Sequence, residues 1–189
     1  MSIETPVDTL RLLIVSCSLN PASKSRRMGE IARVQLEAKG AEVDWIDLRN
    51  HDLPLCQDKE SKFHPEAQAL RKRIAAADGI LLCAPVYNYG LNAAAKNLTE
   101  LTGLAWKEQV VAMAVAAGGQ RSGMAPMGFA NSLMLDFRCL IVPRFAYLWR
   151  GSFDETGEPD EAGMERIQLL SDELFRIAQA MKDSKSRER

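Results

Sequence analysis

Hydroxyl and amide side chains crowd a short stretch near the amino end of the chain, between residues 16 and 25. The stretch reads SCSLNPASKS and directly follows the apolar run RLLIV. Such side chains, together with the free N–H groups at the start of a helix, favour an anion. Lys24, Arg26 and Arg27 place positive charge at a helix start, where a bound anion would offset their repulsion from the helix dipole. The pattern predicts a phosphate-binding loop made by Ser16, Ser18, Asn20, Ser23 and Ser25.

A simple helix cap is the alternative explanation of this loop. Ser23 or Ser25 would then cap the helix, and the neighbouring arginines would be solvated. The loop carries no GxGxxG pattern, and GxxxxGK[ST] occurs nowhere in the chain. These absences exclude a dinucleotide fingerprint and a Walker-type nucleotide site. A hydroxyl-rich loop suits a terminal phosphomonoester, as on FMN.

Two later segments carry aromatic and glycine residues that suit a flat ligand. The segment PVYNYGLN spans residues 85–92, and GGQRSG spans residues 118–123. Tyr87 and Tyr89 offer aromatic faces, and Asn88 can address the heteroatoms of a ring. The sequence Gly118-Gly119-Gln120 exposes backbone N–H groups that a ring edge can approach closely. The alternatives are tyrosines of the core or of a subunit contact, and an ordinary glycine turn.

The elements that must position these segments are short apolar strands. Strands are predicted at Arg11–Val15, Ile80–Ala84 and Val110–Ala116, because these runs are apolar without alternation, as strands buried on both faces are. Glu42–Leu48 mixes charged with apolar residues, and a last strand near Leu140 contains Pro143, so both are predicted at the edges. We therefore expect an α/β, flavodoxin-like three-layer sandwich with a five-stranded parallel sheet in the order 2-1-3-4-5 and helices on both faces. All three polar segments then follow carboxyl ends of strands, where such sheets bind ligands.

Helices fill the gaps between the predicted strands. We expect one carrying the stripe from Met28 to Leu36 and ending near Gly40, and one that begins at Pro65. The others are predicted at Ala93–Thr102, Ser122–Phe137 and Glu161–Met181. No internal repeat or linker divides the chain. We therefore expect one domain over residues 1–189, with flexible ends at 1–9 and 182–189.

Composition narrows the class of protein. The chain has 189 residues, 47% of them hydrophobic and 26% charged, and a formal net charge of -1. These values are typical of a soluble globular domain and argue against a nucleic-acid or anionic-membrane partner. The four cysteines lie far apart without a CxxC pair or a nearby histidine, so we expect incidental thiols and no metal site. No signal peptide and no membrane span are evident, which favours the cytoplasm.

Taken together, the three segments resemble the NADPH-dependent FMN reductase family. SCSLNPASKS is similar to the family's first loop, GSLRxxSxN, at Ser18 and Ser23, and the pair Gly118-Gly119 is similar to its third loop. PVYNYGLNAAAKN resembles its second loop, PEYNxSxPGxLKN, and retains Pro85, Tyr87, Asn88, Lys96 and Asn97. The resemblance runs over about residues 10–150. The chain departs from the family pattern at Cys17, Asn20 and Asn92, which replace a glycine, an arginine and a proline.

The resemblance implies an enzyme that binds FMN and passes hydride from NADPH or NADH through the flavin to a small acceptor such as a flavin or a quinone. Ser18, Asn20, Ser23 and Ser25 would hold the phosphate. The isoalloxazine would lie against Pro85, Val86, Tyr87 and Asn88, with Gly118 and Gly119 at its far edge. The flavin carries the chemistry, so no catalytic side chain is expected. Family resemblance also implies a homodimer or homotetramer.

The missing arginine at position 20 leaves the choice between NADPH and NADH open, because a 2′-phosphate favours a guanidinium partner. Arg26 and Arg121 are the candidate substitutes.

Other classes of function remain to be weighed against the reductase. A non-enzymatic flavodoxin-type electron carrier and a phosphate-ligand binder without turnover would use the same loops. A serine hydrolase is disfavoured, because the chain has no GxSxG and only two histidines, His51 and His64, in the segment after the second strand.

Overall fold

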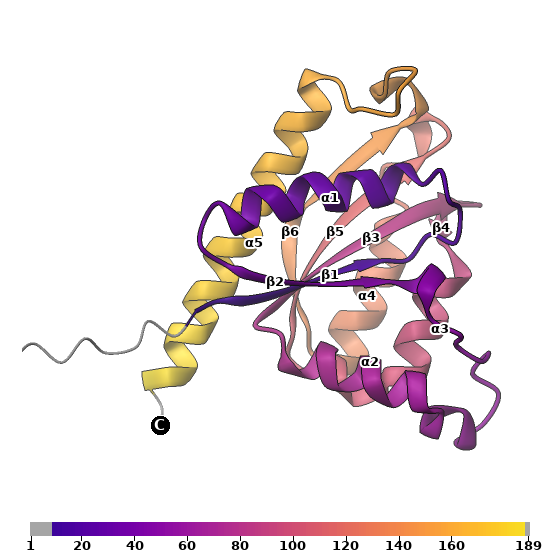
Figure 1. Ribbon diagram of the computed structural model, residues 1–189, viewed down its shortest axis with the longest axis vertical. Coiled ribbons are helices and arrows are strands. Elements are labelled where there is room, and N and C mark those ends of the chain that lie inside the picture. Colours follow the sequence, from indigo (N-terminus) through magenta and orange to yellow (C-terminus); the bar gives the residue numbers. More distant parts are fainter. Residues whose placement is uncertain (1–8, 188–189) are drawn as a thin grey trace, which may run out of the picture.

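The computed structural model describes residues 9–187 and shows a twisted sheet between two layers of helices (Figure 1). The sheet has the order β2-β1-β3-β5-β6, and a short strand, β4, pairs with β3 off this path. The strands are β1 (Arg11–Ser16), β2 (Glu42–Asp47), β3 (Gly79–Tyr87), β4 (Gly90–Leu91), β5 (Val110–Ala117) and β6 (Leu140–Trp149). The helices are α1 (Lys24–Glu37), α2 (Pro65–Ala76), α3 (Ala93–Thr102), α4 (Pro126–Phe137) and α5 (Glu161–Arg187).

The five long strands run parallel and have the predicted flavodoxin-like order. β1 pairs with β2 on one side and with β3 on the other, so the order of strands reverses beside β1. In open sheets of this kind a crevice forms at that reversal, outside the carboxyl ends of the strands. The fold therefore places the ends of β1 and β3 where a ligand crevice is expected.

Two apolar layers hold the helices on the sheet. α1 and α5 cover one face, and α2, α3 and α4 cover the other (Figure 1). Alternate residues of the central strands serve the two layers: in β1, Leu12 and Ile14 pack toward the α1 side, and Leu13 and Val15 toward the α2 side. This double burial explains why the central strands read as unbroken apolar runs.

Several boundaries differ from the sequence prediction, for identifiable reasons. β3 continues to Tyr87 instead of ending at Ala84, because β4 folds back and pairs with its last residues. The second strand ends at Asp47, and Leu48 begins a short 3-10 helix, η1 (Leu48–Asn50). The predicted start of α4 at Ser122 is wrong: a 3-10 turn, η4 (Gln120–Ser122), comes first, and the helix begins at Pro126.

The carboxyl-terminal helix is longer than predicted. α5 runs through Arg187, so Lys182 to Arg187 are helical and do not form the expected loose tail. Lys182 explains part of this order, because its ammonium bonds the Asp78 carboxylate at 2.9 Å and the Thr9 carbonyl at 2.7 Å. The other predicted flexible residues, 1–8 and 188–189, lie outside the described part of the chain. Within residues 9–187, no helix combines the length and apolar character needed to cross a bilayer.

Candidate functional site

A cavity of about 230 Å³ opens at the carboxyl ends of β1, β3, β5 and β6. We call it the serine cavity, because the loop between β1 and α1 supplies one wall of hydroxyl groups. Eight of the predicted site residues line it: Ser18, Asn20, Ser23, Ser25, Pro85, Val86, Tyr87 and Gly118. The fold therefore brings the three predicted segments to one place. Its remaining lining residues are Ala22, Lys24, Ala116, Ala117 and Arg150.

The serine loop is ordered by its own side chains. Ser23 is the N-cap of α1, where its Oγ accepts the Arg26 N–H at 3.1 Å and lies 3.1 Å from the Ser25 hydroxyl. Ser18 Oγ accepts the Asn20 N–H at 3.3 Å, and Asn20 Oδ1 accepts the Ala22 N–H at 2.9 Å. Each serine that accepts a backbone N–H keeps a hydroxyl proton to donate. Ser23 therefore caps the helix and also lines the cavity, so the two interpretations of the loop are compatible.

A buried carboxylate supports the loop from behind. Asp47, 3% exposed at the end of β2, accepts from Arg26 Nε at 2.9 Å and from Arg49 Nη2 at 2.6 Å. Arg49 also reaches the Pro21 carbonyl in the serine loop at 3.4 Å. Burial favours a higher pKa for Asp47, but the hydrogen bonds from Arg49 and Arg26 outweigh it and hold the pKa below its usual value. This network ties the end of β2 to the start of α1.

The two arginines at the start of α1 are paired with carboxylates, so they are neither solvated, as the alternative of a simple helix cap expected, nor dependent on a bound anion to offset their charge. Besides Asp47, Arg26 contacts Glu30 at 2.5 Å, and Arg27 contacts Glu158 at 2.7 Å and Glu30 at 3.4 Å. Their charges are therefore already balanced by carboxylates. Arg26 is in consequence a poor candidate for the missing arginine at position 20.

The second wall is a hairpin rather than a free loop. Val86 pairs with Leu91, and Tyr87 pairs with Gly90. Asn88 and Tyr89 form the two-residue connection with φ of 49° and 63°, the left-handed geometry that tight hairpin turns require. Pro85, Val86 and Tyr87 line the cavity, whereas Asn88 and Tyr89 lie beyond the strand end and do not. The tight turn places these two residues past the cavity wall.

The third wall is bare backbone. A Cβ at Gly118 would meet no atom within 4 Å, so the main chain there is open to a ligand. Gly119 and Gln120 do not line the cavity, because the chain turns into η4. Tyr147 of β6 holds that turn: its hydroxyl donates to the Gly119 carbonyl and accepts the Ser122 N–H at 3.3 Å.

Ser16 belongs to β1 rather than to the loop. Its hydroxyl is buried and has no hydrogen-bond partner among the described residues, and it does not line the cavity. In a strand, alternate residues share a face, so Ser16 faces the α1 side with Leu12 and Ile14. Asn92 has a clearer role, because its Nδ2 donates to the Cys17 carbonyl at 2.7 Å. It ties the start of α3 to the end of β1.

Arg150 lines the serine cavity but is not among the residues predicted from the sequence. It follows β6 directly and lines the serine cavity from the side of α1. Its position directly after a strand is the sequence signal for it, because the carboxyl ends of parallel strands form the ligand site in such sheets. Its guanidinium has no carboxylate partner among the described residues, and no Asp, Glu or His lines the cavity. Hydroxyls, a helix start and two cations, with no acidic residue in the cavity lining, form a donor set that fits a phosphate group.

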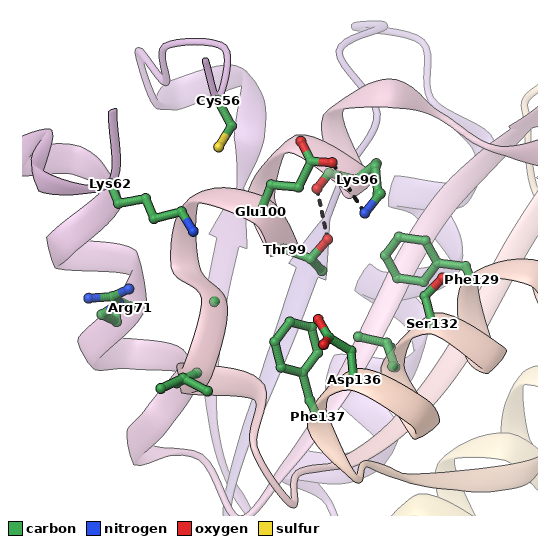
Figure 2. A pocket seen from close by; sticks show the side chains of 13 residues that line it. Cys56, Lys62, Arg71, Lys96, Thr99, Glu100, Phe129, Ser132, Asp136 and Phe137 are labelled. Carbon is green, nitrogen blue, oxygen red and sulfur yellow. Dashed lines mark hydrogen bonds and ion pairs between the residues drawn. The ribbon is translucent and has the colours of Figure 1, made fainter. Parts of the chain in front are cut away.

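A larger cavity, of about 490 Å³, lies between α2, α3 and α4 (Figure 2). We call it the helical cavity. Lys62 and Arg71 line it on the side of α2, and Lys96, Glu100 and Asp136 line it on the side of α3 and α4, beside exposed apolar groups. Lys96 pairs with Glu100 at 3.2 Å, and Arg71 Nε donates to the Thr102 carbonyl at 3.1 Å. No predicted site residue lines this cavity, and no three potential metal-ligating side chains cluster within residues 9–187.

Comparison with known proteins places the chain among flavin enzymes. NADPH azoreductase from Bacillus sp. (strain OY1-2) is 25% identical over 178 residues, which cover 93% of this chain and 97% of that protein. FMN reductase (NADPH) from Pseudomonas putida (strain KT2440) is 28% identical over 122 residues, 63% of this chain and 61% of that protein.

Solved structures share the fold. The flavoenzyme NAD(P)H:(acceptor) oxidoreductase FerB from Paracoccus denitrificans has a TM-score of 0.75 at 18% identity, over 92% of this chain and 99% of that chain. RosB, with a bound 8-demethyl-8-formylriboflavin-5′-phosphate, has a TM-score of 0.78 at 15% identity, over 93% of this chain and 81% of that chain. The model of the family described as NADPH-dependent FMN reductase matches residues 10–152, which include all three walls of the serine cavity. This chain therefore belongs to the NADPH-dependent FMN reductase family.

Proposed function

We propose that the serine cavity binds FMN and that the protein passes hydride from NADPH or NADH to a small acceptor, such as a free flavin or a quinone. Membership of the family makes the chain an oxidoreductase that uses FMN and a reduced nicotinamide. The observation that carries the assignment of the site is the meeting of the serine loop, the β3 end and Gly118 around one cavity without acidic residues.

The phosphate end of the ligand would lie at the start of α1. Ser18 and one of the hydrogen-bonded pair Ser23 and Ser25 have a hydroxyl proton to donate there, and the first N–H groups of the helix point the same way. The Asp47–Arg26–Arg49 network holds this loop in place before a ligand arrives. A preformed loop loses little conformational entropy on binding, which favours affinity.

The ring end would lie between the β3 end and Gly118. Pro85 and Val86 present an apolar wall, and the open backbone at Gly118 admits a ring edge. Tyr87 is 56% exposed at the rim, so it can cover one ring face without closing the cavity. When bound, FMN supplies the hydride-accepting centre. The protein residues bind and orient, because no Asp, Glu, His or Cys side chain lines the cavity.

Binding and rapid mixing test this function. The purified protein should quench FMN fluorescence with saturable stoichiometry, and NADPH or NADH should then bleach the flavin absorbance rapidly. Ser132→Val, in the helical cavity, serves as a control that keeps both properties. A protein that binds FMN but is not bleached by either nucleotide would instead be an electron carrier of the flavodoxin type. Failure to bind FMN would overturn the proposal.

We also propose that the chain forms a homodimer or homotetramer and works in the cytoplasm. Leu104, Met127 and Leu135 are exposed apolar side chains on or beside α3 and α4. We expect these side chains to lie in the subunit contact, because burying exposed apolar groups favours association. Light scattering should give a mass of two or four chains, and a monomer at micromolar concentration would contradict the assembly. The cytoplasm follows from the co-substrate, because reduced nicotinamide nucleotides are kept inside cells.

A further inference from the structure

Arg150 differs from the other arginines around the serine loop in having no anionic partner. Arg26, Arg27 and Arg49 each contact at least one carboxylate within 2.9 Å. The Arg150 side chain makes no hydrogen bond or ion pair with any residue in the described part of the chain, yet the residue lines the serine cavity. An exposed guanidinium beside hydroxyl donors is therefore available to a ligand anion.

The main chain of Arg150 is fastened to the helix start that carries the serines. Lys24 Nζ donates to the Arg150 carbonyl at 3.3 Å and lies 4.7 Å from the centre of the Phe153 ring. Arg27 joins the same segment to α1 through Glu158. These contacts hold residues 150–158 against α1, so Arg150 stays at the phosphate end of the cavity.

The turn after Arg150 depends on a close packing contact. A Cβ at Gly151 would lie 2.3 Å from Cη2 of Trp149, so a side chain there would displace the indole. Glycine at this position leaves room for the Trp149 indole against the turn, and Arg150 lines the cavity beside it. The geometry of the β6 end thus positions Arg150 without contacts from its own side chain.

We propose that Arg150 binds the 5′-phosphate of FMN, together with the serine hydroxyls and the start of α1. A guanidinium offers a planar set of donors that matches two phosphate oxygens. Asn20 cannot supply this charge, and its Oδ1 already accepts the Ala22 N–H. The proposal rests on the proposed function, because it assumes that FMN occupies the serine cavity.

The 2′-phosphate of NADPH is a second phosphomonoester that Arg150 could attract. We assign FMN because Arg150 lines the same cavity as the N-cap Ser23 and Ser25, which the phosphate end of FMN would occupy. Experiments with ligands that lack one phosphate distinguish the 5′-phosphate of FMN from the 2′-phosphate of NADPH. Riboflavin has the ring of FMN without its phosphate, and NADH lacks the 2′-phosphate of NADPH.

The test compares binding of FMN and riboflavin by fluorescence quenching in the wild type, Arg150→Ala and Arg150→Lys. Arg150→Ala should weaken FMN about tenfold, the loss of one charge-assisted contact at an exposed position, and leave riboflavin within about twofold. Arg150→Lys should restore part of the FMN affinity. Arg144→Ala removes the same charge from an exposed position on β6 outside the cavity and should change neither affinity. Circular dichroism melts establish that each variant is folded.

Three results would overturn the proposal. Equal loss of FMN and riboflavin affinity in Arg150→Ala would assign Arg150 a structural role in the cavity. An unchanged FMN-to-riboflavin ratio with a raised KM for NADPH, but not for NADH, would assign Arg150 to the nucleotide. A wild-type protein that binds neither flavin would remove the proposed function together with this inference, whereas the first two results leave the proposed function standing.

Discussion

The serine cavity and the helical cavity lie against the same sheet but differ in the charge of their lining and in the elements that form their walls. The helical cavity is about twice as large, 490 against 230 Å³, and its lining combines basic residues with the acidic Glu100 and Asp136. The serine cavity contains Lys24 and Arg150 and no carboxylate. Its walls come from the ends of four strands, whereas helices and a 3-10 turn line the helical cavity (Figure 2).

This difference teaches that volume alone does not locate the site in this fold. In the helical cavity Lys96 pairs with Glu100, and the carboxylates of Glu100 and Asp136 in the same lining offset the charge of its basic residues. Cations without a carboxylate partner, beside preorganised hydrogen-bond donors, leave positive charge that an anionic ligand can neutralise. The serine cavity also lies at the reversal of strand order, where sheets of this kind bind ligands.

The largest expected effect comes from closing the serine cavity. Gly118→Val places a branched side chain in open space, so we expect the fold to tolerate it and FMN to bind about 100-fold more weakly, about 2.7 kcal/mol. Ser132→Val adds similar bulk to the helical cavity and should leave FMN affinity unchanged. Fluorescence titration measures both. Equal FMN affinity in Gly118→Val and the wild type would place the FMN site elsewhere.

The next effect tests the support behind the serine loop. Asp47→Asn should lower the free energy of unfolding by about 2 kcal/mol, below the range for fully buried pairs, because Arg26 and Arg49 keep 34% and 23% of their side chains exposed. Urea unfolding measures this loss. Lys96→Ala, which breaks the exposed pair with Glu100 in the helical cavity, should change stability far less.

The same carboxylate gives a pH dependence with a defined sign. The folded-state pKa of Asp47 is lowered, so its stabilisation is present above the unfolded-state pKa of about 4 and is lost as pH falls through the folded-state value. The free energy of unfolding of the wild type should therefore fall more steeply below about pH 4 than that of Asp47→Asn. Parallel curves for the two proteins in acid would show that Asp47 is not the group responsible.

A smaller effect is expected from single serines. Ser23→Ala removes the N-cap of α1 and should cost about 1 kcal/mol of stability, with weaker FMN binding as well. Ser132→Ala removes a hydroxyl that bonds only the Gly128 carbonyl within its own helix, and should alter neither property. Chemical unfolding and FMN titration of the two variants decide this. If Ser23→Ala lost stability while FMN affinity stayed intact, Ser23 would act as a cap alone.

The smallest effect concerns the thiols beside the two cavities. Burial, with the nearby Cys83 and Asp47, raises the pKa of Cys17 well above its usual value, and burial raises the pKa of Cys139 to about 11. Cys56, on the helical cavity, is partly exposed. One equivalent of a maleimide should therefore label Cys56 in the native protein at neutral pH without changing FMN affinity. Rapid labelling of Cys17, checked by peptide mass, would show that the end of β1 opens.

Local patterns determined much of the fold. The apolar runs of β1, β3 and β5 indicated buried parallel strands, and α3 lies at Ala93–Thr102 as predicted. Such patterns are readable because burial on both faces, or on one helical stripe, dictates residue type at each position. Element ends were less predictable: the Asn88–Tyr89 turn forms only because β4 has β3 to pair with. Pairing of this kind is a property of the folded chain.

The sequence by itself determined the type of sheet, which strands are central or at an edge, and the hydroxyl-rich loop, because burial on one or both faces of a strand selects residue type locally. Only the tertiary structure decided which cations are available to a ligand. Arg26 and Arg27 directly follow the serine loop yet are paired with Asp47 and Glu158, whereas Arg150, 125 positions beyond Ser25, lines the cavity without a carboxylate partner. Charge pairing depends on distances in space, and the chain reveals those distances only after it has folded.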